Sequence, residues 1–156
     1  MNTRVFLSSL GAFLLLCVAS RKSAAAEPQA HRFAAELIWG TNGGKPPGQD
    51  LKPVAPELQK FLGRVFKWSQ YFRIERKEFP VTPARAAKVD MSKECRLEVT
   101  QLTADEFEIE LFGKGILVVR KRQHIAPGEL VVLGGDDKND NAWFVVLTLA
   151  KPGERK

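Results

Sequence analysis

The sequence is poor in the residues that build compact reactive centres, with two cysteines and two histidines among its 156 residues. Cys17 lies in an N-terminal segment that we expect to be removed, which leaves Cys95 alone in the mature chain. A single cysteine excludes an intramolecular disulfide and a cysteine-based zinc cluster. Because Cys95 alternates with Leu97 and Val99, we expect its side chain to lie in the core. A reactive or intermolecular thiol is the alternative.

The chain also lacks an apolar run long enough for a membrane span, which takes about 20 residues. Its longest run, Val5–Val18, comes after Arg4 and is followed by small residues up to Ala26. A positive start, a short apolar stretch and a small-residue exit are typical of a secretory signal peptide. We therefore predict that residues 1–26 are a signal peptide. The mature protein is then exported, periplasmic or extracellular, and without a transmembrane span.

The cleavage position has alternatives. Ala26 ends a run of small residues, and Ser20 ends a second, shorter one. A lipid anchor on Cys17 would need a small residue directly before it, where Leu16 stands.

No large excess of one charge is left once this segment is set aside. The whole chain has a net charge of +6, and residues 1–26 carry three of the positive residues and no acid, which leaves +3. So small a charge gives little support for a nucleic-acid partner. The remaining length suits one hydrophobic core. We predict a single globular domain over residues 27–150 and a flexible tail over residues 151–156.

Alternation of apolar and polar residues predicts short strands along most of the mature chain. Glycine and proline clusters separate them, and the 113–115 segment reads as a hairpin turn. The two last strands are continuous apolar runs, which favours central positions covered on both faces. The expected strands are His31–Trp39, Tyr71–Phe79, Lys88–Met91, Cys95–Leu102, Phe107–Phe112, Ile116–Arg122, Glu129–Leu133 and Trp143–Ala150.

One amphipathic helix is expected within Leu51–Trp68, with Pro56 suited to its first position. An apolar stripe at spacings of three and four predicts that one face is buried on the sheet. The stripe is Leu58, Phe61, Leu62, Val65 and Phe66. The predicted fold class is mainly β (α+β): an antiparallel sandwich or half-barrel of about seven or eight strands, with the helix packed on it.

Two loops invite a ligand-binding interpretation. The Gly43–Lys45 segment lacks the first glycine and the final Ser or Thr of a phosphate-binding loop, so we interpret it as a linker. The Asp136–Asn141 segment clusters oxygen ligands but has Ala142 where a calcium loop needs glycine and Thr148 where it needs an acid. A polar turn is the favoured interpretation there, and weak calcium binding is the alternative.

Catalytic, cofactor and metal residues are not predicted. The mature chain has His31, His124, Ser69 and Ser92, none of them in a nucleophile elbow. Three glutamates of one strand, at 106, 108 and 110, share one face, which favours a solvated side of a sheet over a pair of catalytic carboxylates in a cleft.

Two groups of residues are candidates for partner binding. Arg120 and Arg122 share one strand face and suit an anionic surface, although a solvated edge is the simpler interpretation. Trp39, Trp68 and Tyr71 flank the helix and suit a groove for a peptide or sugar; the alternative places them in the joint between helix and sheet.

Several packing and turn segments carry a resemblance. They are Leu37–Asn42, Phe66–Trp68, Tyr71–Phe72, Gly134–Gly135 and Ala142–Phe144. In these the chain resembles small exported bacterial proteins of unassigned function. Its order of strand, linker, helix and β-rich remainder is distantly similar to periplasmic modules of envelope secretion machinery. The resemblance implies an envelope location and carries over no catalytic residue.

Two functions remain as hypotheses. The first is a non-catalytic binding or assembly module of the bacterial cell envelope, whose partner is another envelope protein and which needs no cofactor. It rests on export, a β-rich core and sheet edges that can pair with another chain. The alternative is a small exported hydrolase or carbohydrate-active domain with an unrecognised carboxylate site.

Overall fold

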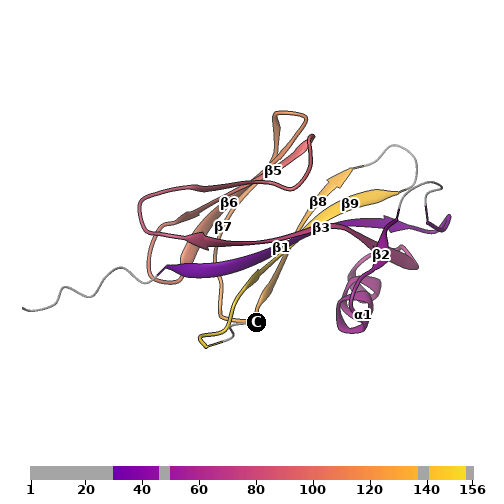
Figure 1. The fold of residues 1–156 in the computed structure, drawn as a ribbon, viewed down its shortest axis with the longest axis horizontal. Helices are drawn as coiled ribbons and strands as arrows, with labels where there is room; N and C mark the ends of the chain where they lie inside the picture. The colour runs from indigo at the N-terminus through magenta and orange to yellow at the C-terminus, as the bar shows by residue number, and fades with distance from the viewer. Residues whose placement is uncertain (1–29, 46–49, 137–140, 154–156) are drawn as a thin grey trace, which may run out of the picture.

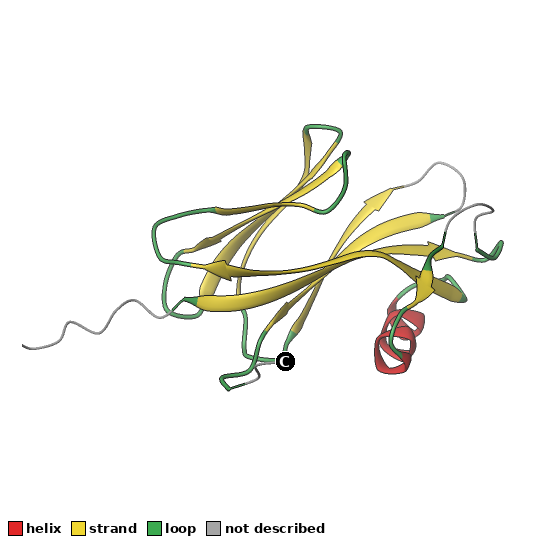
Figure 2. Cartoon of the chain, in the orientation of Figure 1, coloured by secondary structure: helices red, strands yellow, loops and turns green. Residues whose placement is uncertain are grey.

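The computed structural model describes residues 30–45, 50–136 and 141–153, in which two antiparallel sheets face each other and one short helix lies on the outside (Figures 1 and 2). The predicted mainly β fold with one early helix is confirmed, and the sheets do not close into a barrel. The predicted signal peptide over residues 1–26 lies outside the described residues, as does most of the 136–141 loop.

The first sheet has the strand order β2-β3-β1-β9-β8, and the second has the order β4-β5-β6-β7. All neighbouring strands in both sheets run antiparallel. The elements are β1 (His31–Thr41), β2 (Lys52–Pro53), α1 (Pro56–Val65), β3 (Gln70–Val81), β4 (Ala87–Asp90), β5 (Cys95–Gln101), β6 (Glu106–Gly113), β7 (Ile116–His124), β8 (Leu130–Asp136) and β9 (Ala142–Leu149).

The main core fills the space between the sheets and follows from the alternation of each strand. In β6, Phe107, Ile109 and Leu111 are fully buried, and in β5 the inward residues are Cys95, Leu97 and Val99, as predicted. The first sheet contributes Phe33, Ala35, Leu37, Phe79, Val81, Val131, Leu133, Val145, Leu147 and Leu149. Because both inner faces are apolar, sheet-on-sheet packing is the arrangement that removes them from water together.

A second, smaller core lies between α1 and the opposite face of the first sheet. Leu58 and Leu62 are the buried helix residues, and they pack with Ile38, Val54, Tyr71, Ala142, Phe144 and Val146. Aromatic rings join helix and sheet, with the centroids of Phe66 and Phe144 4.5 Å apart. The first sheet is therefore covered on both faces, by the second sheet on one and by the helix on part of the other (Figure 1).

Two predictions about individual elements are wrong. The apolar stripe of the helix is only partly buried: Phe61 is 36% exposed and Val65 57% exposed. The helix has only ten residues, so the i, i+4 pair Leu58 and Leu62 spans its contact with the sheet. β8 was expected to be central but pairs with β9 alone among the described strands, whereas β9 is an inner strand as predicted.

The β6–β7 hairpin contains a register shift. Its two-residue turn has Lys114 at φ 52° and Gly115 at φ 77°, the left-handed pair typical of a type I′ turn. Between Leu111 and Phe112 the register shifts, so Val118 is the extra residue of β7. A second shift in the β1–β3 pairing leaves Ile74 as the extra residue of β3.

Candidate functional site: an aromatic hollow between the sheets

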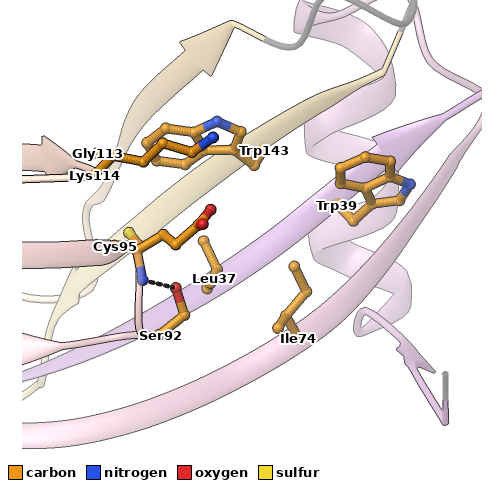
Figure 3. Close-up of a pocket in the computed structure, with 9 residues that line it drawn as sticks. Leu37, Trp39, Ile74, Ser92, Cys95, Gly113, Lys114 and Trp143 are labelled. Atoms are coloured by element: carbon orange, nitrogen blue, oxygen red, sulfur yellow. Dashed lines mark hydrogen bonds between the residues drawn. The ribbon is translucent and has the colours of Figure 1, made fainter.

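A hollow of about 210 Å³ lies between the two sheets, where the first sheet extends past the ends of β5 and β6 (Figure 3). Its floor comes from the first sheet and its rim from the loops at the ends of β4, β5 and β6. The lining residues are Leu37, Trp39, Ile74, Ser92, Glu94, Cys95, Gly113, Lys114 and Trp143.

Two tryptophans of the first sheet line the hollow. Trp39 of β1 lies directly opposite Trp143 of β9 in the register of the first sheet. The alternation that buries Phe33, Ala35 and Leu37 continues to Trp39 and brings it to the same inner face. Both tryptophans are only half-buried, because the hollow leaves part of each ring uncovered. Two aromatic side chains on adjacent strands offer a large apolar surface that is already held in place by the sheet.

The two register shifts lie beside this floor. Ile74, the extra residue of β3, lines the hollow and is 40% exposed. Val118, the extra residue of β7, is 43% exposed and lies against Gly113, where a Cβ would be 3.1 Å from Val118 Cγ2 and 3.4 Å from a Trp143 ring carbon. Bulges redirect side chains and concentrate next to functional sites. Here they bring exposed apolar residues to the border of the hollow.

The polar part of the rim is held by backbone hydrogen bonds. The Glu94 amide donates to Ser92 Oγ over 3.2 Å, and the Lys114 amide donates to the Glu94 carbonyl over 2.7 Å. Glu94 supplies the only carboxylate among the nine lining residues. The site is therefore an apolar hollow with one acid and one base at its rim, a surface suited to binding an apolar group.

Cys95 lies at the base of the hollow and is 6% exposed. Burial raises the pKa of its thiol from 9.0 to about 11, because the thiolate would lose its hydration there. The thiol is therefore protonated near neutral pH, which makes it a poor nucleophile. The prediction that Cys95 is a core residue is confirmed.

The pH dependence of stability follows from this thiol. Between pH 9 and about 11 the unfolded chain releases the Cys95 proton while the folded chain keeps it, so the free energy of unfolding falls as the pH rises. The contribution is complete below pH 9 and is lost by about pH 11, with a total of about 2–3 kcal/mol. Urea unfolding across this range should show a flatter profile for Cys95→Ala than for the wild type. Parallel profiles would contradict the assignment.

The predicted aromatic group is divided between the two faces of the first sheet. Trp39 lines the hollow, whereas Trp68 and Tyr71 lie in the second core with the helix. Tyr71 is 1% exposed and its hydroxyl donates to the Leu62 carbonyl over 3.1 Å. The ring centroid of Trp68 is 5.2 Å from that of Phe144. The structure thus brings Trp39 together with Trp143 and not with Trp68 or Tyr71.

The basic pair lies on the outer face of the second sheet. Arg120 pairs with Glu110, and Arg122 pairs with Glu108. Each arginine is opposite its glutamate in the β6–β7 register. The three glutamates of β6 therefore share the face away from the core, as their alternation indicated, and β7 supplies arginine partners for Glu108 and Glu110.

Metal-ligating groups do not gather in the part of the chain that the structure describes: no set of three His, Cys, Asp or Glu residues there is arranged to hold an ion. His31 packs edge-on against Phe107 at 5.3 Å between ring centroids. His124 Nδ1 is 3.3 Å from Asp105. The suggested calcium loop falls mostly on residues 137–140, outside the described residues.

Comparison with known proteins returns no relative. No family model, curated protein or solved structure matches the chain. Across the described ranges, no helix is long and apolar enough to cross a membrane. The likeness to small exported proteins therefore stays a prediction.

Of the nine lining residues, sequence reasoning named only Trp39 as a candidate binding residue. The apolar residues that it missed include Trp143 and Ile74 in the lining, and Val118 beside Gly113. Trp143 begins the continuous apolar run of β9, in which every residue was expected to be covered. Ile74 and Val118 owe their positions to register shifts. The sequence contains one signal for such exposed positions, which is an apolar residue within a polar stretch. In the 73–76 segment, Ile74 lies between Arg73 and Glu75.

Proposed function

We propose that the mature chain is a non-catalytic binding module of the bacterial cell envelope, whose hollow at Trp39 and Trp143 holds an apolar side chain of another envelope protein. The observation that carries this proposal is the half-buried tryptophan pair, bordered by exposed Ile74 and Val118. Exposed apolar surface on a small domain commonly marks a site of interaction. The signal-peptide pattern of residues 1–26 supports the envelope location.

The size of the hollow favours one side chain over a whole metabolite. Sites for drug-sized ligands usually enclose about 300–1,000 Å³, and an engineered cavity of about 150 Å³ accepts benzene. A hollow of about 210 Å³ therefore suits one aromatic or branched aliphatic group. Such a group in a pocket, with a polar rim around it, is the usual centre of a protein–protein contact.

The alternative hydrolase hypothesis has less support from the site. Hydrolysis of a glycosidic bond typically uses two carboxyl groups about 5–10 Å apart on either side of the bond, and this hollow has Glu94 alone. Glu36, Glu98, Glu108 and Glu110 form ion pairs with basic side chains on the outer faces of the sheets. These arrangements favour binding over catalysis.

Selection from a random nine-residue peptide library on the immobilised domain tests the proposal. We expect enrichment of sequences with a large apolar residue at one constant position. In a Trp68→Phe background, the fluorescence of the remaining tryptophans should then report binding of the selected peptide. Replacing its apolar residue by alanine should weaken binding by about 10- to 100-fold, since burial of a large apolar side chain contributes about 1.5–3 kcal/mol.

Two matched variants locate the contact. Ile74→Asp places a charge at the border of the hollow, whereas Val65→Asp makes the same kind of change at an exposed site on α1. Binding should be lost in the first variant and kept in the second. Enrichment of polar peptides, no enrichment, or unchanged binding in Ile74→Asp would each contradict the proposal.

A further inference from the structure

The four sheet edges differ in how they are protected from pairing with another chain. An exposed edge strand is usually kept from pairing by shortness, charge, proline or a bulge. β2 has two residues and contains Pro53, and β4 has four residues and carries Lys88 and Asp90. β7 carries three consecutive basic residues, 120–122, and a register shift at Val118.

β8 lacks these protections except for one charged residue, Asp136, at its last position. It has seven residues, without proline and without a charged residue from Leu130 to Gly135. Its pairing with β9 runs without a register shift. Its other side pairs with no strand among the residues that the structure describes. From Leu130 to Gly135, the backbone groups on that side are therefore available to another chain as a regular ladder without charged side chains.

Both faces of β8 are apolar and already packed. Val131 and Leu133 belong to the core between the sheets, and Leu130 and Val132 pack against the second core. A strand added beside β8 would therefore need apolar residues on both of its faces. Within this protein, β8 itself meets that requirement.

We propose that β8 pairs antiparallel with β8 of a second copy of this chain, joining two five-stranded sheets into one. Directly opposite residues of an antiparallel pair share a face, so inner residues must meet inner residues. The register centred on Val132 satisfies this: Val131 lies opposite Leu133, Leu130 opposite Gly134, and Val132 opposite its own copy. No like charges meet within these pairs.

Repulsion between like charges disfavours a dimer in which β7 pairs with β7 of the second copy. Its full-length antiparallel register would put Arg120 of one copy opposite Arg120 of the other, and like charges directly opposed are destabilising. The extra residue Val118 would also interrupt the ladder. We therefore assign the contact between the two copies to β8 and not to β7.

Charged substitutions of Val132, the residue that lies opposite its own copy on the two-fold axis of the proposed dimer, test the pairing. The mature wild-type chain should sediment as a dimer in analytical ultracentrifugation. Val132→Lys and Val132→Glu should each be monomeric, with dissociation constants raised at least about tenfold, because two like charges would meet at the axis. An equimolar mixture of the two variants should regain the dimer, since each lysine would face a glutamate.

The control is Val118→Lys, the same substitution on the β7 edge, which should leave the dimer intact. Amide hydrogen exchange of the wild type gives a test that needs no folded variant: protection of β8 amides should increase with protein concentration. A monomeric wild type, a dimer that survives Val132→Lys, or β8 exchange that is independent of concentration would each overturn the proposal.

Discussion

Replacing Phe107 by alanine is expected to lower the free energy of unfolding by about 3–5 kcal/mol, which is typical for truncation of a buried phenylalanine. Phe107 is fully buried in the core between the sheets. Its ring meets Phe33 edge-on, with centroids 5.0 Å apart. A loss of this size is a large share of the 5–15 kcal/mol typical of a domain, so the domain should unfold at low denaturant concentration.

Chemical unfolding followed by circular dichroism measures this effect. Leu102→Ala serves as the matched control, because Leu102 follows β5 and is 41% exposed. We expect that control to change the free energy of unfolding by no more than about 0.5 kcal/mol. Equal losses in the two variants would contradict the assignment of the main core.

Leu62→Ala is expected to cost about 2–5 kcal/mol, the usual range for a buried leucine. Leu62 is fully buried under the first sheet, and its carbonyl accepts the hydrogen bond of the Tyr71 hydroxyl. Loss of the side chain should loosen the helix from the sheet. Thermal unfolding and amide exchange of α1 in the variant would measure both consequences.

Its neighbour provides the control. Phe61→Ala should cost clearly less than Leu62→Ala, because Phe61 is 36% exposed. The sequence pattern alone predicts that Phe61 is buried and that Phe61→Ala is severely destabilising. Comparing Phe61→Ala with Leu62→Ala therefore tests whether Phe61 is buried, as the pattern predicts, or partly exposed, as in the structure. A larger effect of Phe61→Ala than of Leu62→Ala would show that the stripe is buried as the sequence indicates.

Periodicity predicted most of the fold because most strands have one buried face. The alternation of Phe107, Ile109 and Leu111 with three glutamates placed β6 and both of its faces correctly. Pro56 marked the first helical residue. The prediction that β8 is a central strand was wrong because its residues are apolar on both faces. An edge strand that is covered by two cores has the same sequence pattern as a central strand.

The pairing of charges could not be predicted, because one extra residue decides it. Continuing the hairpin without a shift would put Arg120 opposite Ile109. The shift at Val118 puts Arg120 opposite Glu110 and Arg122 opposite Glu108. Alternation places residues on faces, but it does not locate a bulge, which depends on the packing of both strands.

The hollow was predicted only through Trp39. Its partner Trp143 belongs to an apolar run in which alternation gives no inner or outer face. The opening between the sheets depends on where β5 and β6 end relative to β1 and β9. That relation is a property of two sheets packed together, and local sequence does not contain it.

The indole N–H resonances of the three tryptophans, followed by NMR as a selected peptide is added, test the central claim most directly. Trp39 and Trp143 line the hollow, and Trp68 lies on the opposite face of the first sheet as an internal control. If the hollow holds the apolar side chain, the signals of Trp39 and Trp143 should shift with a common affinity while that of Trp68 stays in place. Movement of Trp68 alone, or saturable binding that moves neither Trp39 nor Trp143, would contradict the account.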